Sequence, residues 1–129
     1  MATLDTFQSD VLLGQVGSSD LGYTVEEVTV TIQAGMKMGA ALELVGGKYI
    51  WVVAANVANT AAILVDPDAE GYVEELTAGD HTLVVAKRGT TIALNKVTLA
   101  DSTDAATIRS AADAFEAAGS NKVTDKVFG

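Results

Sequence analysis

The sequence of 129 residues contains no cysteine and a single histidine, His81. The absence of cysteine excludes disulfide bonds, thiolate zinc sites, iron–sulfur clusters and cysteine nucleophiles. A histidine-ligated metal site or a proton relay would have to be built around His81 alone. We therefore expect neither a cofactor nor a metal.

Positive charge is also scarce. Eight Lys and Arg residues against 17 Asp and Glu residues give a formal net charge of −9. An acidic chain lacks the positive field that attracts nucleic acids, and it is repelled by anionic membrane surfaces. No uninterrupted apolar run approaches the ~18 residues of a membrane-spanning helix, and residues 1–10 lack the pattern of a signal peptide. We expect a protein that is made in the cytoplasm and binds neither nucleic acid nor membrane.

Aromatic residues make up 5% of the chain and charged residues 19%, whereas hydrophobic residues reach 49%. The charged fraction lies below the roughly 25% that is typical of soluble domains, and the apolar content argues against disorder. The length suits one domain with one hydrophobic core. The apolar excess is a mild indication of oligomerisation or of docking to a partner.

Apolar side chains alternate in several short segments, which is the pattern of half-buried β-strands. Gly46-Gly47 lies between two such segments and predicts a hairpin, because both glycines can adopt positive φ. The spacing of the segments predicts a mainly β (α+β) fold, either a small sandwich or a barrel. Strands are predicted at 28–32, 36–44, 48–54, 61–65, 73–76, 81–86, 91–94 and 97–99.

Near the end of the chain the apolar period changes to that of a helix. Residues 101–103 offer N-cap side chains, and Gly119 fits the position after a helix C-terminus. One short α-helix is therefore predicted at about 103–118, with Ala105, Ile108, Ala112 and Phe115 as its apolar stripe. A last strand is predicted in the tail, around Val123.

Residues 1–26 keep neither a helical nor a strand period. They are interpreted as a separate N-terminal segment, and residues 27–129 as the β-rich domain. The segment is either a frayed terminus or an extended arm that orders on a partner. Its apolar clusters favour the arm. The candidate partner-binding residues are Thr3, Leu4, Asp5, Thr6, Phe7, Val11, Leu12 and Leu13.

Short motifs that suggest chemistry have simpler interpretations. Residues 66–71 have the acid spacing of a calcium loop, but Thr77 stands where a bidentate glutamate is required. Gly46-Gly47-Lys48 lacks the upstream glycine and the following Ser or Thr of a phosphate loop. His81 has no nucleophile or orienting partner that the sequence indicates. Trp51 is interpreted as a core residue, with an interface anchor as the alternative. We therefore expect no enzymatic activity.

Six segments occur in a suggestive order: Val-Glu-Glu-Val-Thr-Val (25–30), Ala-Gly-Met-Lys-Met-Gly-Ala-Ala-Leu (34–42), Gly-Gly-Lys-Tyr (46–49), Ala-Ala-Ile-Leu (61–64), Thr-Leu-Val-Val-Ala-Lys-Arg-Gly (82–89) and Ala-Ala-Gly (117–119). The ordered series resembles the lambda-type head decoration proteins of tailed bacteriophages. The resemblance spans about residues 25–120.

This resemblance implies a barrel-like (β-tulip-like) domain that decorates the outer surface of the expanded phage head. It further implies a homotrimer at local three-fold positions that binds the major capsid protein and stabilises the shell. The arm residues named above would then add to a sheet edge of the coat protein. Another virion part, such as a head fibre base or a tail-tube module, is an alternative. A secreted carbohydrate binder is disfavoured, because the chain has few aromatic residues.

Overall fold

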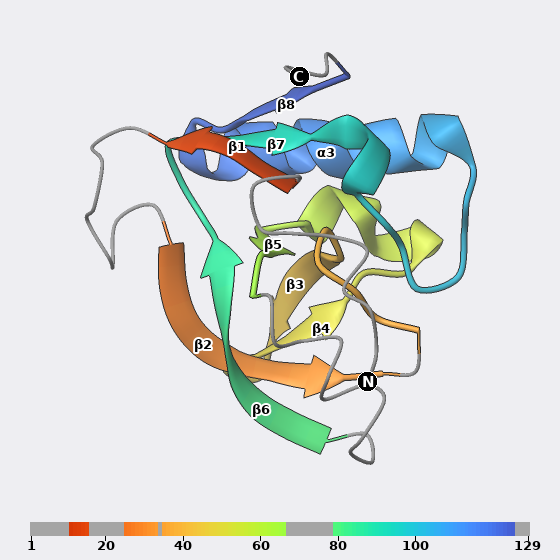
Figure 1. The fold of residues 1–129 in the computed structure, drawn as a ribbon. Helices are drawn as coiled ribbons and strands as arrows, with labels where there is room; N and C mark the ends of the chain where they lie inside the picture. The colour runs from red at the N-terminus through yellow and green to blue at the C-terminus, as the bar shows by residue number, and fades with distance from the viewer. Residues whose placement is uncertain (1–10, 16–24, 34, 67–78, 126–129) are drawn as a thin grey trace, which may run out of the picture.

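The computed structural model describes residues 11–15, 25–33, 35–66 and 79–125. The described chain forms a closed five-stranded barrel, a separate three-stranded sheet and one C-terminal α-helix (Figure 1). The predicted mainly β, barrel-like fold with a single C-terminal helix is therefore confirmed. Within these ranges, no helix has the length and apolar character needed to cross a membrane.

The barrel is built from a long, strongly curved pair of strands and three shorter ones. Its spatial order is β2 (Val25–Ile32), β4 (Lys48–Trp51), β3 (Ala41–Val45), β5 (Ala62–Leu64) and β6 (Gly79–Ala86). The strands β2 and β4 are parallel, and the other neighbours are antiparallel. Because β6 pairs with β2 along its whole length, the barrel closes and leaves no free edge.

Apolar side chains fill the barrel. Trp51 is 9% exposed, and its indole N–H donates a hydrogen bond to the carbonyl of Thr98 at 3.1 Å. This confirms the interpretation of Trp51 as a core residue, since a buried indole needs an acceptor. The buried members of this cluster are Val30, Ile32, Met36, Ala40, Leu42, Tyr49, Trp51, Ala62, Leu64, Leu83 and Val85.

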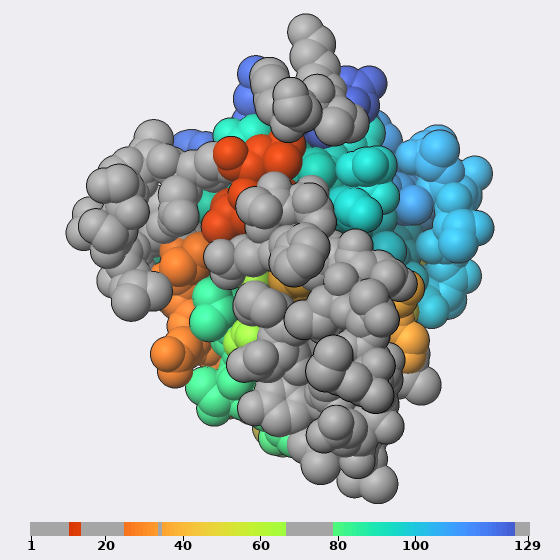
Figure 2. Space-filling model, in the orientation of Figure 1, coloured from red at the N-terminus to blue at the C-terminus, as the bar shows by residue number. Residues whose placement is uncertain are grey.

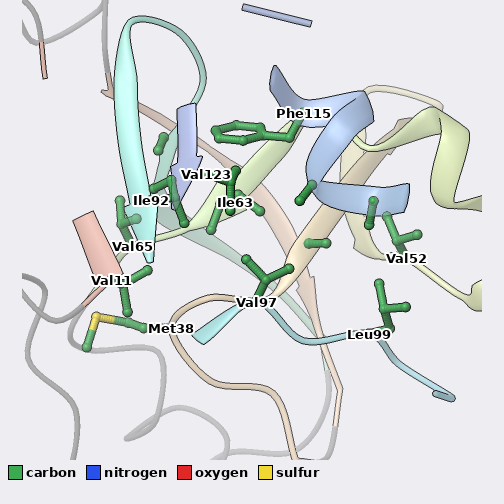
Figure 3. Packing of buried hydrophobic residues seen from close by; sticks show 14 of the residues in the cluster. Val11, Met38, Val52, Ile63, Val65, Ile92, Val97, Leu99, Phe115 and Val123 are labelled. Carbon is green, nitrogen blue, oxygen red and sulfur yellow. The ribbon is translucent and has the colours of Figure 1, made fainter. Parts of the chain in front are cut away.

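The second layer lies beside the barrel (Figure 1). It consists of β1 (Leu12–Gln15), β7 (Thr90–Ala93), β8 (Lys122–Thr124) and the helix α3 (Ala105–Gly119). In the sheet, β7 is central, with β1 antiparallel and β8 parallel to it. Figure 3 shows Phe115 of α3 above Val123, Ile92 and Ile63, so the helix, the sheet and the barrel share one apolar cluster.

The strand predicted at 36–44 begins only at Ala41. Gly39 has a φ of 98° and lies so close to the chain at Lys96 that an added Cβ would be 1.9 Å from the Lys96 carbonyl oxygen. The segment before β3 forms turns instead of a strand, with the Ala40 N–H bonded to the Lys37 carbonyl at 3.2 Å. The predicted strand at 97–99 is also wrong, because Thr98 makes only an isolated bridge to Ala40, after the 3₁₀ turn η2 (Leu94–Lys96).

The strands predicted at 48–54 and 73–76 are not both described by the structure. The strand predicted at 48–54 ends at Trp51, and the 3₁₀ helix η1 (Ala54–Asn59) follows it. The one predicted at 73–76 lies outside the described residues. The structure also adds β1, for which the sequence showed no persistent period.

The helix α3 begins two residues later than predicted. Its N-cap is Asp104, whose carboxylate accepts a hydrogen bond from the Thr107 N–H at 3.0 Å. A hydrogen bond from the Thr107 hydroxyl, together with this backbone bond, lowers the pKa of Asp104. The predicted stripe is correct for Ala112 and Phe115, and Ile108 is half-buried, but Ala105 is exposed and Ala111 takes its place in the core.

The helix does not end at Gly119 in the way that the sequence predicted, with glycine as the residue after the C-terminus. The helix continues through Gly119, and Ser120 adopts the left-handed conformation with a φ of 53°. Gly119 is required because an added Cβ would lie 2.2 Å from the carbonyl oxygen of Lys87. Asn121 completes the junction: its side chain bonds both the N–H and the hydroxyl of Thr90, and it donates to the carbonyls of Lys87 and Phe115.

Candidate functional site

The candidate binding residues of the N-terminal arm fall into two groups. Thr3, Leu4, Asp5, Thr6 and Phe7 lie outside the described residues, whereas Val11, Leu12 and Leu13 lie within them. Val11 is fully buried in the shared apolar cluster, and Figure 3 shows it near Met38 and Val65. Leu12 packs against the same cluster. Val11 and Leu12 therefore stabilise the domain's own core, and partner binding by the eight residues stays a prediction.

The strand β1 is an edge strand of the three-stranded sheet. Its register shifts between Leu12 and Gly14, so that Leu13 is an extra residue relative to β7. Figure 2 shows part of β1 at the surface beside β7. The folded body thus includes residues 11–15, which precede the boundary at residue 26 that the sequence suggested. The division at residue 26 and the partner-binding arm stay predictions, and residues 1–10 lie outside the described chain.

The opposite edge of this sheet, at β8, is occupied by side chains from α3. The Val123 N–H donates to Glu116 Oε2 at 2.9 Å, and Arg109 Nη1 donates to the Val123 carbonyl at 3.5 Å. Arg109 is itself held by Glu116 and Asp113 at 3.1 and 3.0 Å. Glu116 and Arg109 are bonded to the N–H and the carbonyl of Val123. Another strand therefore cannot pair with these backbone groups without displacing the two side chains.

The β3–β4 hairpin ends in an exposed apolar tip. Gly46 and Gly47 have φ values of 59° and 83°, which is the two-residue turn that suits the right-handed twist of paired strands. The hairpin predicted from these glycines is confirmed. Directly before the turn, Leu44 is 55% and Val45 50% exposed, and these are the exposed large hydrophobic residues of the described chain.

Glu43 lies next to this tip and is 5% exposed. Its Oε2 atom has no hydrogen-bond partner in the described part of the chain. Strand alternation places Glu43 on the same face of β3 as Val45, opposite Ile50 of β4. A buried carboxylate oxygen without a donor is costly, because the water that it loses is not replaced.

The neighbouring lysine does not neutralise Glu43. Lys48 lies opposite Val45, and its ammonium group instead contacts the Asp80 carboxylate at 2.5 Å. Asp80 also accepts the Thr31 hydroxyl at 2.8 Å. The hydrogen bonds from Lys48 and Thr31 lower the pKa of Asp80. The cation of the hairpin is thus already paired.

A second charged group joins the start of β2 to the segment after β6. Glu26 accepts hydrogen bonds from Lys87 and Arg88, each at 3.1 Å. Burial raises the pKa of Glu26, but the hydrogen bonds and positive charges of these two residues outweigh it, so the net shift is downward. The group stabilises the barrel seam.

Two residues that were considered for chemistry, His81 and Asp66, are placed by the described chain. His81 lies within β6 opposite Val30. Asp66, the first residue of the calcium-like segment, accepts the Val84 N–H at 3.0 Å, while residues 67–71 lie outside the described chain. Across the described ranges, no three His, Asp or Glu side chains come together as metal ligands.

Comparison with known families decides which class of protein this is. The family model of the bacteriophage PhiTE minor capsid decoration protein matches residues 1–129. The chain belongs to this family. The resemblance to phage head decoration proteins is thereby confirmed, and the chain is a structural component of a phage capsid. Neither the curated proteins nor the solved structures contain a match.

The hairpin tip of this decoration protein is not among the candidate residues that the sequence predicts. Glu43 and Leu44 fall within the strand predicted at 36–44, without a role of their own. A signal was present: two successive apolar residues, Leu44 and Val45, directly precede the glycine turn, and both cannot face the core of one strand. The acid at position 43 also interrupts an otherwise apolar segment.

Proposed function

We propose that this chain decorates the outer surface of the expanded phage head, where it binds the major capsid protein as a trimer at local three-fold positions and stabilises the shell. The observation that supports this proposal is the family match across the whole chain. The fold agrees with it, since a closed barrel and the layer packed against it form a compact body.

Stabilisation of the shell follows from multivalent binding. A trimer that contacts several coat subunits at once converts its second and third contacts into intramolecular events with a high effective concentration. If the site exists only on the expanded lattice, occupancy stabilises that lattice by mass action. Individually weak contacts then suffice to hold the shell.

The N-terminal arm supplies one contact in this proposal. Residues 1–10 precede the buried Val11, so the body fixes the point at which the arm leaves the domain. An extended arm can pair its backbone with an exposed sheet edge of the coat protein, while Leu4 and Phe7 fill apolar pockets. Leu13, which is half-buried in β1, lies at the base of the arm.

A pelleting assay with expanded, undecorated heads tests the proposed function. The full-length chain should sediment with expanded heads and not with unexpanded ones. Deletion of residues 2–10 should reduce occupancy at least tenfold and leave the circular dichroism spectrum unchanged, because Val11 and β1 remain. No sedimentation of the full-length chain contradicts capsid binding, and equal occupancy of the two forms contradicts the role of the arm.

The trimer is tested separately. Light scattering of the free chain and cryo-electron microscopy of decorated heads should together show trimers, at least on the lattice. Single copies that are spaced apart on the lattice contradict the trimer and leave capsid binding itself intact.

A further inference from the structure

We propose that the tip of the β3–β4 hairpin, formed by Glu43, Leu44 and Val45, is a second capsid-binding surface that receives a basic side chain flanked by apolar residues of the coat protein. The proposal rests on the function proposed above and adds a named site and the chemistry of its partner. It does not involve the arm.

The apolar part of this surface is Leu44 and Val45. Both are at least half exposed, although apolar side chains on short barrel strands normally face the core. The two-glycine turn holds them in a fixed orientation, since β3 and β4 are paired up to Val45 and Lys48. A rigid apolar tip loses little conformational entropy on binding, which favours docking.

The polar part is the Glu43 carboxylate. It is 95% buried by its own domain, and its Oε2 atom has no donor within the described residues. It shares a strand face with Val45, so the unpaired oxygen and the apolar tip lie on the same hairpin. The Oε2 atom is closed off in the free domain, so the Glu43 side chain has to turn outward before a lysine or arginine that packs over Val45 can provide the missing hydrogen bond and charge.

Charge argues that the occupant is a basic partner and not another copy of this chain. The chain carries a net charge of −9. Four of its eight basic residues, Lys48, Lys87, Arg88 and Arg109, are already bonded to its own acids. In a two-fold contact, a second copy would bring another Glu43 to the tip, and two desolvated like charges repel each other. A coat-protein surface with an unpaired Lys or Arg is complementary.

The binding test uses the full-length chain and expanded, undecorated heads. Replacement of Leu44 and Val45 together by serine should weaken binding about tenfold or more, because the apolar contact area is lost. Glu43→Gln should weaken it about tenfold, because the glutamine has no charge to pair with the cation. Glu27→Gln, an exposed position on β2, removes the same charge and should bind normally.

Stability separates a binding role of Glu43 from a structural one. If the carboxylate serves only a partner, the melting temperature of free Glu43→Gln at pH 7 should equal or exceed that of the unaltered chain. Weaker binding together with an unchanged or higher melting temperature supports the proposal. A lower melting temperature with unchanged binding shows a structural role and overturns it.

The remaining outcomes are also decisive. Normal binding by the double serine variant overturns the hairpin as a capsid contact but leaves the proposed function standing, provided that the unaltered chain sediments. A double variant that binds poorly because it no longer forms trimers in light scattering shows that a second copy occupies the tip, which also overturns the proposal. No sedimentation of the unaltered chain contradicts the proposed function itself.

Discussion

The end of the molecule at α3 and β8 and the end at the β3–β4 hairpin differ in how completely their polar and apolar groups are paired. At the helix end, Glu116 and Arg109 bond the outward N–H and carbonyl of Val123, and Asn121 makes four hydrogen bonds inside the junction. At the hairpin end, Leu44 and Val45 are exposed and Glu43 has a buried oxygen without a donor in the described chain.

This difference separates stability from binding. The helix end forms polar and apolar contacts that a folded domain needs, and its sheet edge is closed to further strands. The hairpin end carries costs that a stable monomer would avoid, and such costs are commonly retained where a surface has a function. The comparison predicts that substitutions at the helix end affect folding, and that those at the hairpin end affect binding.

The largest effect is expected for Phe115→Ala. Phe115 is fully buried in the shared cluster, so its truncation leaves a cavity between α3, β7 and β8. The free energy of unfolding should fall by about 3–5 kcal/mol, measured by urea denaturation. Ala105→Ser, on the exposed side of the same helix, is the control and should change it little. A small loss for Phe115→Ala would mean that the helix end does not hold the fold.

Asn121→Ala should have the next largest effect. It leaves the Thr90 hydroxyl and the carbonyls of Lys87 and Phe115 without their partner in a buried place. Each such group costs about 1–3 kcal/mol, with partial rescue by water, so we expect a loss of about 3 kcal/mol. Thermal denaturation followed by circular dichroism measures it. An unchanged melting temperature would show that water replaces the whole network.

Acid should weaken the barrel seam by a smaller amount. The folded-state pKa of Glu26 is lowered, so its contribution is complete above the ordinary value of 4.5 and is lost as the pH falls through the folded value. The pKa values of Asp80 and Asp104 are likewise lowered from their ordinary value of 3.8, so both residues also stabilise the fold less as the pH falls. Glu26→Gln should cost less than about 1 kcal/mol at pH 7 and reduce the acid-induced loss. Equal pH profiles for the variant and the unaltered chain would contradict this assignment.

The smallest effect on folding is expected at the hairpin tip. Replacement of Leu44 and Val45 by serine removes side chains that are already exposed, so the free energy of unfolding should change by less than about 0.5 kcal/mol. Urea denaturation of the free protein is the measurement. A large loss would place both side chains in the core and would remove the contrast between the two ends.

Much of the fold could be predicted from local patterns. Alternation over residues 28–32 predicted most of β2, the glycine pair predicted the hairpin, and the stripe through Ala112 and Phe115 predicted the helix face. These features depend on side chains that are near each other in the sequence, where periodicity is informative.

The features that sequence reasoning missed depend on distant contacts. The strand β1 is too short to show a period and is held by β7, which lies far along the chain. Gly39 and Gly119 are required by the backbone of Lys96 and Lys87, respectively, and no local pattern indicates such an approach. The unpaired oxygen of Glu43 likewise becomes evident only once the barrel is closed.

Cryo-electron microscopy of expanded heads saturated with the full-length chain tests the central claim most directly. The account predicts density on the outer surface of the shell in which the β3–β4 hairpin faces the coat protein, with a Lys or Arg of the coat beside Glu43. Heads without added density, or a bound domain whose hairpin points away from the coat protein, would contradict it.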